Sequence, residues 1–422
     1  MRKQKLFVLL WMLVLTCLPV SAEEYRNPVI PGYHPDPSVC RVGDTFYLVN
    51  SSFQYFPGVP IFQSKDLVHW QQIGNVLDRE SQLPLKGASS WLGIYAPTIR
   101  YHEGTYYMIT TNVGNGGNFM VTAKDPRGPW SEPVWLKQQG IDPSLYFENG
   151  KCYMVSNPGD AIWLCEINPK TGEQLTESKQ LWQGDGGRYP EGPHIYKKDG
   201  YYYLLISEGG TELAHRLTIA RSRNIEGPYE SNPNNPILTN CSRLGQSKQI
   251  QGTGHGDLVQ AGDGNWWMVF LAYRNYGGSY HHLGRETYLA PVEWKEGEWP
   301  VVNGGMPIDT LVKANTLPSV LLEKHLEADA EDAPATGAFE WVQLQNPIPG
   351  NYLRNDTMAV EEKYFVRLYP HGTLTENQQP TFVGRRQESA SFSLETDVVT
   401  KGEVEAGLSV YQINDGHLDF FV

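Results

Sequence analysis

The sequence predicts an all-β protein in which a five-bladed β-propeller is followed by a partial β-sandwich domain. The 422-residue chain contains 24 Tyr, 12 Trp and 14 Phe beside 42 Gly and 29 Pro. That composition favours short strands joined by many turns over long helices. A strand–turn–strand pattern also recurs five times along the chain, and apolar alternation resumes after an acidic, alanine-rich segment.

The first 22 residues are expected to form a signal peptide (1–22) that is not part of the fold. Three basic residues precede the apolar run 6–15, and the small residues at 20–22 are typical of a cleavage site. The run is too short for a comfortable membrane span, and no later stretch approaches one. Lipoprotein processing at Cys17 is an alternative, which the preceding Thr16 disfavours. We therefore expect export to the periplasm or the extracellular medium.

The charge of the chain restricts the class of partner. Residues 1–22 carry three positive charges and no acids, so their removal takes the formal net charge from −13 to −16. A strongly negative surface disfavours nucleic acid and anionic lipid as partners. An uncharged substrate fits better.

Five repeats fill residues 27 to about 310, which places the propeller domain at 23–315. Each has a small or acidic residue, usually a proline, alternating apolar residues, a glycine-containing turn and an aromatic strand. The repeats begin at Asp36, Ala96, Asp142, Gly192 and Gly256, with separations of 60, 46, 50 and 64 residues. A repeat near 50 residues that consists of short strands is typical of propeller blades.

Each repeat is expected to supply two inner strands from its hairpin and two outer strands from the residues that follow. Ile61–Trp70, for example, is interpreted as a third strand, a turn and the start of a fourth. Aromatic pairs such as 106–107 and 202–203 are expected to pack mostly blade against blade. Cys152 and Cys165 flank a predicted turn, where two buried thiols are favoured over a cross-strand disulfide.

The starts of the repeats carry the candidate catalytic residues. The innermost strands of a propeller line its central channel, so equivalent starting residues converge at one mouth. Three starts carry a carboxylate, namely Asp36, Asp142 and Glu191. The fifth repeat carries His255 at the corresponding place, and the second carries Tyr95. One Asp-Pro alone is ordinary turn chemistry, but three acids at one register predict a site, because clustered like charges are costly without a purpose. Two carboxyl groups that flank a sugar linkage perform glycoside hydrolysis.

Three segments carry a family resemblance. His34-Pro-Asp-Pro-Ser38, Gly140-Ile-Asp-Pro-Ser144 and Tyr189-Pro-Glu-Gly-Pro-His194 resemble the signature segments of glycoside hydrolase family 43. Further segments resemble the β-xylosidase and α-L-arabinofuranosidase branch of this family, namely 51–60, 64–70, 95–97, 208–211, 254–256 and 283–287. The resemblance covers residues 27 to about 310 in the expected order.

The resemblance implies an inverting, exo-acting enzyme that releases terminal xylose or arabinofuranose from plant-wall xylan or arabinoxylan oligosaccharides. It implies that Asp36 is the general base, that Glu191 is the general acid, and that Asp142 tunes the pKa and orientation of Glu191. No cofactor is required. The expected sugar-binding residues are Phe53, Tyr95, Thr211, His255 and Arg285.

Several alternatives stay open at this point. Arg285 could instead form a surface salt bridge with Glu286. In related propellers a histidine such as His255 faces the channel beside a calcium ion or an ordered water, but calcium prefers a cluster of oxygen ligands. A non-catalytic carbohydrate-binding propeller would be favoured if an acid were missing. A retaining fructan-type hydrolase would need Asn-Asp-Pro in the first blade, where His34-Pro35 precedes Asp36.

The C-terminal part is divided into a linker at 316–338 and a partial β-sandwich at 339–422. The linker is acidic and alanine-rich, and segments 382–387 and 405–408 resemble the sandwich that follows the propeller in two-domain family members. About half of the usual sandwich length is present. An unpaired sheet edge would then be exposed, which predicts poor order or aggregation for residues 340–422. In relatives this domain lends a loop that helps to close the sugar pocket.

Overall fold

The structure is a computed structural model that describes residues 23–314, 339–355 and 365–422. The predicted signal peptide and the predicted linker lie outside these residues. Within the described ranges, the only helical element is a 3-10 turn at Asn303–Gly305 (η1). No helix in the described part of the chain is long and apolar enough to span a membrane.

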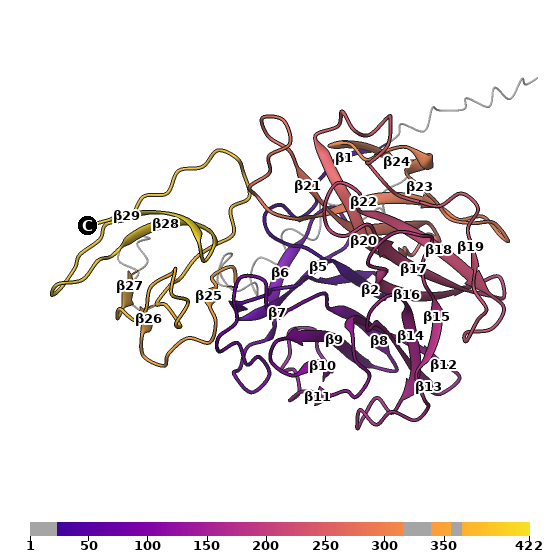
Figure 1. The fold of residues 1–422 in the computed structure, drawn as a ribbon, viewed down its shortest axis with the longest axis horizontal. Helices are drawn as coiled ribbons and strands as arrows, with labels where there is room; N and C mark the ends of the chain where they lie inside the picture. Colours follow the sequence, from indigo (N-terminus) through magenta and orange to yellow (C-terminus); the bar gives the residue numbers. More distant parts are fainter. Residues whose placement is uncertain (1–22, 315–338, 356–364) are drawn as a thin grey trace, which may run out of the picture.

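Five antiparallel sheets, each a meander from the channel outward, form the blades of a ring (Figure 1). Blades 1 and 2 comprise β2 (Ser38–Val42), β3 (Thr45–Val49), β5 (Gly58–Ser64) and β6 (Gln71–Leu77), then β7 (Gly93–Ile94), β8 (Thr98–His102), β9 (Thr105–Val113), β10 (Gly117–Ala123) and β11 (Val134–Trp135). Blades 3 and 4 comprise β12 (Ile141–Glu148), β13 (Lys151–Asn157), β14 (Ile162–Ile167) and β15 (Lys179–Trp182), then β16 (Glu191–Lys198), β17 (Tyr201–Glu208), β18 (Arg216–Ser222) and β19 (Glu230–Ser231). Blade 5 comprises β20 (Ile250–Gln260), β21 (Trp266–Arg274), β22 (Glu286–Glu293) and β23 (Val301–Val302). The predicted five-bladed propeller is confirmed.

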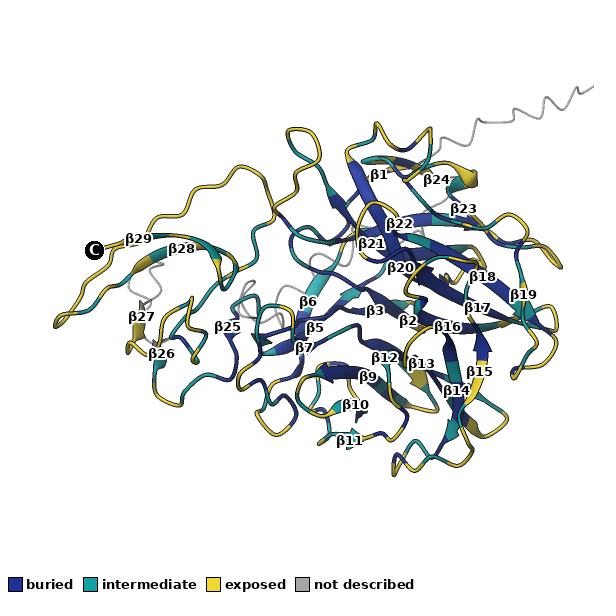
Figure 2. Cartoon of the chain, in the orientation of Figure 1, coloured by how far each residue is buried: buried dark blue, intermediate teal, exposed yellow. Residues whose placement is uncertain are grey.

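Aromatic side chains pack one blade against the next, as the paired tyrosines predicted. Tyr47 of blade 1 meets Tyr106 of blade 2 with ring centroids 5.4 Å apart. Tyr107, on the opposite face of the same strand, meets Phe147 of blade 3 at 4.9 Å. Alternate side chains of a strand point to opposite faces, so one Tyr-Tyr pair serves two interfaces. Figure 2 shows the inner strands of the ring largely buried.

The ring closes where the two ends of the propeller segment meet. β1 (Glu23–Arg26) pairs with β24 (Leu311–Ala314). The Asn27 side chain accepts from the Leu289 N–H at 3.0 Å and donates to the Leu289 carbonyl at 2.9 Å. These contacts join the residues before blade 1 to the strands of blade 5.

The two central cysteines are free, buried thiols, as the sequence favoured. Cys152 lies opposite Ile167 in the β13–β14 register, and Cys165 lies opposite Met154. The two cysteines are therefore displaced along their strands, and each packs in the apolar layer between blades 2 and 3.

The C-terminal residues lie beside blades 1 and 2 (Figure 1). Their strands are β25 (Gln343–Leu344), which pairs with β4 (Tyr55–Phe56), and the hairpins β26 (Tyr352–Asn355)–β27 (Phe365–Leu368) and β28 (Gly407–Ile413)–β29 (Gly416–Phe421). Buried Asn346 bonds the propeller on both sides, because its Oδ1 accepts from Leu85 N–H at 2.6 Å and its Nδ2 donates to the Leu83 carbonyl at 2.7 Å. On β29 the side chain of Phe420 is 64% exposed. Poor order of this part stays a prediction.

Candidate active site

Equivalent residues of four inner strands, at the strand start in blades 1, 3 and 4 and at a bulge within β20 in blade 5, share an unusual backbone conformation beside the mouth of the channel. Asp36, Asp142, Gly192 and His255 have φ values of 55°, 53°, 60° and 44°. The ladders of β12, β16 and β20 each shift register at this point. Bulges of this kind re-aim side chains beside active sites, and a left-handed non-glycine residue persists only where its surroundings enforce it. Residues at equivalent positions of the repeats therefore share the same local backbone geometry.

Asp36 is buried and held in its ionised form. Its Oδ1 accepts from Arg285 Nη1 at 3.0 Å, and its Oδ2 accepts from the Ser51 hydroxyl. Burial alone would raise the pKa of Asp36, but the Arg285 guanidinium, His255 and the Ser51 hydroxyl outweigh burial, so the pKa lies below its ordinary value. A carboxylate in this state accepts a proton.

The surroundings of Asp142 and Glu191 raise the pKa values of these carboxyl groups, in contrast to the lowered pKa of Asp36. Burial and then the negative charge of Asp36 raise the pKa of Glu191 to about 7, although the Arg285 guanidinium opposes this. Burial and the charges of Glu191 and Asp36 also raise the pKa of Asp142, against the Gly192 N–H that donates to its Oδ2 at 3.1 Å. Two close buried carboxyl groups titrate together, and this pair holds a proton near neutral pH.

His255 lies between the two aspartates. Its Nδ1 is 3.9 Å from Asp36 Oδ1 and 3.9 Å from Asp142 Oδ2. Burial lowers its pKa, so the ring is neutral near pH 7. A Cβ atom at Gly192 would lie 3.0 Å from the imidazole Cε1 atom, which explains the glycine after Glu191. His255 thus packs against both sides of the acid cluster.

Aromatic rings form one wall beside the acids. The Arg285 guanidinium lies 5.5 Å from the centre of the Phe53 ring, and that ring is 5.3 Å from Tyr95 and 5.8 Å from Tyr33. The charges of all three acids act on the Tyr95 hydroxyl, which donates to the Trp91 carbonyl at 2.8 Å. The structure therefore brings Phe53, Tyr95 and Arg285 together with the acids.

Arg285 does not pair with Glu286, so that alternative is wrong. The Glu286 carboxylate bonds Arg274 at 2.7 Å through both oxygens. Neighbouring side chains of an extended chain point to opposite faces. Arg285, directly before β22, therefore faces Asp36, whereas Glu286, the first residue of β22, points to the other side.

Thr211 is the predicted site residue that the structure does not bring into the cluster. It is exposed on the loop after β17, and the neighbouring Glu212 pairs with Arg188. The charge of Glu212 raises the pKa of Glu191, so this loop lies near the acids, although Thr211 forms no hydrogen bond with them within the described residues.

Sequence reasoning missed Ser51 and Tyr33, which lie outside the repeat register. Tyr33 packs on Phe53 and has a half-buried ring beside Arg285. The C-terminal part reaches this wall, since Arg386 Nε donates to the Tyr33 carbonyl at 2.8 Å. The His-Pro-Asp motif could have drawn attention to Tyr33, which directly precedes it.

Two residues below the acid cluster, a second layer of inner side chains fills the channel. Fully buried Asp257 accepts from Arg100 Nη1 at 2.7 Å, from the Tyr196 hydroxyl at 2.6 Å and from the Ser38 hydroxyl at 2.7 Å. Arg100 Nη2 lies 2.9 Å from His194 Nδ1. The layer joins blades 1, 2, 4 and 5.

The second layer does not fit a calcium ion beneath His255. Calcium needs several free oxygen ligands, but both oxygens of Asp257 are engaged, and the Arg100 guanidinium supplies the positive charge at this depth. Among the residues that the structure describes, no group of three or more His, Cys, Asp or Glu side chains could hold a metal ion.

Comparison with known proteins shows which family the chain resembles. A sequence profile of glycosyl hydrolases family 43 matches residues 25–300, and one of the β-xylosidase C-terminal concanavalin A-like domain matches residues 333–422. A xylosidase/arabinosidase of Butyrivibrio fibrisolvens is 45% identical over 94% of this chain and 79% of its own length. The non-reducing end α-L-arabinofuranosidase BoGH43B of Bacteroides ovatus is 41% identical over 99% of this chain and 79% of its own. The crystal structure of a mutant of the Bacillus licheniformis GH43 protein BlXynB superposes with a TM-score of 0.80 at 37% identity, covering 94% of this chain and 79% of the other.

A propeller with clustered carboxyl groups at its mouth and relatives of this kind is a glycoside hydrolase. More particularly, the chain belongs to glycoside hydrolase family 43, and its C-terminal residues match the β-sandwich domain that accompanies the propeller.

Proposed function

We propose that the enzyme is an exo-acting, inverting glycosidase that releases terminal xylose or arabinofuranose from xylan or arabinoxylan oligosaccharides. The observation that supports this most is the contrast within one cluster. The pKa of Asp36 is lowered, whereas that of Glu191 is raised to about 7. Carboxyl groups whose environments push their pKa values apart are suited to the base and acid roles.

In this mechanism Glu191 donates its proton to the glycosidic oxygen as the bond between that oxygen and the anomeric carbon breaks. Asp36 accepts a proton from a water molecule, whose oxygen bonds to the anomeric carbon from the opposite face and inverts its configuration. Arg285 holds the Asp36 carboxylate in place at 3.0 Å. Asp142 accepts from the Gly192 N–H at 3.1 Å and so helps to orient the neighbouring Glu191. Burial and the charge of Glu191 raise the pKa of Asp142 in turn, so the two carboxyl groups compete for one proton, which is how Asp142 would tune the acid.

The aromatic wall and the activities for which the relatives are named support a terminal pentose as the substrate. Phe53, Tyr33 and Tyr95 offer apolar rings on which a sugar face can pack. The relatives named above are a xylosidase/arabinosidase and an arabinofuranosidase that acts at non-reducing ends. We propose that residues 1–22 direct export to the periplasm or the medium, where plant-wall oligosaccharides occur, and that hydrolysis requires no calcium.

The test is nitrophenol release by the purified chain from aryl β-D-xyloside and aryl α-L-arabinofuranoside. Asp36→Ala should abolish release, whereas Asp44→Ala, at an acid of the same blade whose side chain is 85% exposed, should not. Proton NMR of the first-formed sugar distinguishes inversion from retention. The proposal would be overturned if the parent enzyme released nitrophenol from neither substrate, or if Asp36→Ala were as active as the parent enzyme.

A further inference from the structure

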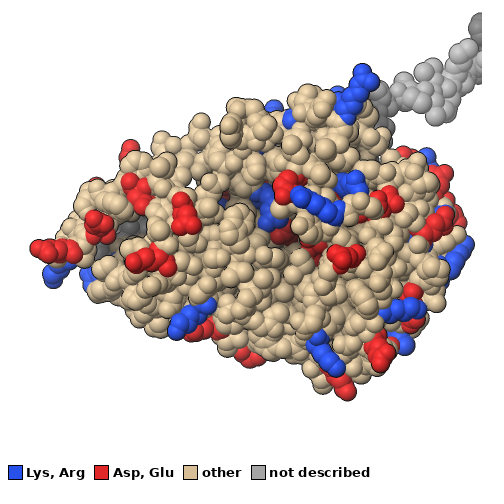
Figure 3. All heavy atoms as spheres, viewed as in Figure 1, with Lys and Arg blue, Asp and Glu red and all other residues tan. Residues whose placement is uncertain are grey.

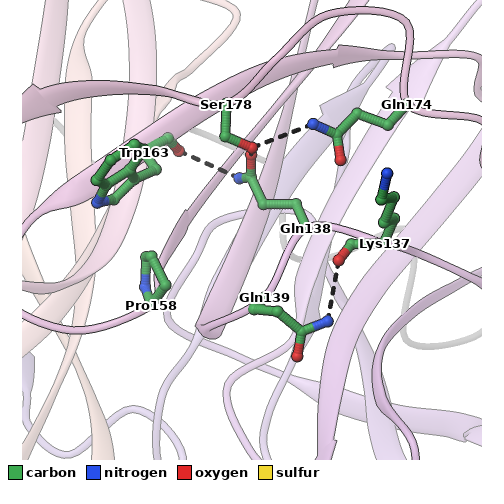
Figure 4. Close-up of a pocket in the computed structure, with 7 residues that line it drawn as sticks. All are labelled: Lys137, Gln138, Gln139, Pro158, Trp163, Gln174 and Ser178. Carbon is green, nitrogen blue, oxygen red and sulfur yellow. Dashed lines mark hydrogen bonds between the residues drawn. The ribbon is translucent and has the colours of Figure 1, made fainter.

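Two adjoining hollows lie on blade 3, outside the acid cluster (Figure 4). Their volumes are about 350 and 410 Å³, and they share Pro158 and Trp163. Figure 4 shows Trp163 and Pro158 on one side of the first hollow and amide side chains on the other. The glutamines that line the two hollows are Gln138, Gln139, Gln174, Gln180 and Gln183.

Hydrogen bonds between side chains hold the floor of the first hollow together. The buried Gln138 amide donates to the Ser156 hydroxyl at 3.0 Å and accepts from the Ser178 hydroxyl at 2.8 Å. Gln174 Nε2 donates to the same Ser178 hydroxyl at 3.1 Å. These groups satisfy one another's hydrogen bonds, so the floor needs no ligand to complete its bonding.

Other polar groups of the hollows have no partner. Trp163 is half-buried at the start of β14, and its indole N–H has no hydrogen-bond acceptor within the described residues. In the same ranges, the exposed side chains of Gln180 and Gln183 make no hydrogen bond. These groups are available to a ligand.

This chemistry suits a neutral sugar. A tryptophan face packs on the apolar face of a sugar ring, and an amide offers a donor and an acceptor to neighbouring hydroxyls. The charged lining residues are one cation and one anion, Lys137 and Asp160. Uncharged surface also prevails on the face seen in Figure 3, where Lys and Arg are interspersed with Asp and Glu. A charged ligand would find no matching field in the hollows.

The residues that line the hollows adjoin, along the chain, the segments that carry the acids. Gln139 lies three residues before Asp142, and Pro158 follows Asn157, whose amide donates to the carbonyl of the residue before Glu191. Trp163 lies near the start of β14, which is the second strand outward from the inner strand β12. At the usual strand spacing this places it about 10 Å from the inner strand, a separation that a short oligosaccharide spans.

We infer that these hollows form a second carbohydrate-binding site, in which Trp163 stacks on a sugar ring while Gln180 and Gln183 bond its hydroxyls. The ligand is a neutral oligosaccharide. That it is the distal part of the chain whose end occupies the acid cluster rests on the proposed function. The site would favour long substrates over short ones.

The experiment is calorimetric titration of xylohexaose and xylobiose into the Asp36→Ala protein, which retains the hollows but lacks the proposed base. Adding Trp163→Ala should weaken xylohexaose binding about five- to tenfold, the size of one aromatic stacking contact, and leave xylobiose binding unchanged. Gln180→Ala/Gln183→Ala, at exposed positions that should not disturb folding, should weaken xylohexaose in the same direction. The matched control is Tyr101→Ala, at a 39% exposed aromatic on blade 2.

Unchanged xylohexaose affinity in both sets of variants, or no xylohexaose binding at all, would overturn the inference. So would an equal loss of affinity for xylobiose or in Tyr101→Ala. Because no arm requires hydrolysis, Trp163-dependent binding would stand even if the parent enzyme released neither aryl pentoside.

Discussion

The raised pKa of Glu191 makes the pH dependence of the reaction the sharpest test of its role. The residue must be protonated to act as an acid, so kcat/KM should fall as pH rises through about 7, the pKa that burial and Asp36 impose. At pH 7 half of the molecules carry the proton. With an ordinary pKa of 4.5, the protonated fraction at pH 7 would be about 150-fold smaller. Between pH 6 and 9, kcat/KM should therefore fall about 100-fold.

The assay compares two leaving groups across this pH range. A substrate with a poor leaving group, such as xylobiose, needs protonation of its glycosidic oxygen. It should therefore show the full decrease of kcat/KM at high pH, the alkaline limb of the pH profile. Glu191→Ala should cost about 100- to 10,000-fold on that substrate, cost little on an activated aryl glycoside, and remove the limb. Glu103→Gln, at an exposed acid in the β8–β9 turn, is the control. A limb centred near pH 4.5, or one that persists in Glu191→Ala, would refute the reasoning.

Three further predictions concern the surroundings of the acids. Arg285→Met should raise the pKa of Asp36 and move the acidic limb of kcat/KM to higher pH, and an unmoved limb in the same pH profile would contradict this. Arg100→Met should lower the free energy of unfolding in urea by about 3–5 kcal/mol, because Asp257 is left buried and unpaired. A loss below about 1 kcal/mol would show that water or another group replaces the guanidinium. Gly192→Ala should cost about 1–2 kcal/mol for its left-handed backbone, together with lower kcat, as thermal unfolding and initial rates would report; an unaltered kcat would separate this glycine from the acid.

The acid cluster could be predicted because its members share one register of a repeat. Asp36, Asp142 and Glu191 stand at or just before the start of an inner strand, and His255 stands at the equivalent place in its repeat, a bulge within β20, so aligning the repeats was enough to bring them together. The left-handed conformation and the bulges that aim them have no sequence pattern of their own.

Contacts between different blades were beyond prediction. Asp36 and Arg285 are 249 residues apart, and only the three-dimensional ring shows that Arg285 faces this carboxylate and not its chain neighbour. Ser51 contributes a hydroxyl from a loop after β3, where nothing in the composition distinguishes it from any other serine. The Arg100–Asp257 layer was missed because each residue alone is typical of a blade strand.

The closure of the ring has a consequence for when the enzyme first becomes active. The contacts of residues 23–30 with 287–314 join the first and last blades, and the Asp36–Arg285 pair lies across that same seam. Pairings so distant in sequence form late, because the loop-closure entropy must be overcome first. Asp36, the proposed base, therefore acquires its guanidinium partner only in a molecule whose last blade has been made and docked. A nascent chain that ends before blade 5 carries all three acids but lacks the Asp36–Arg285 pair of the proposed catalytic centre.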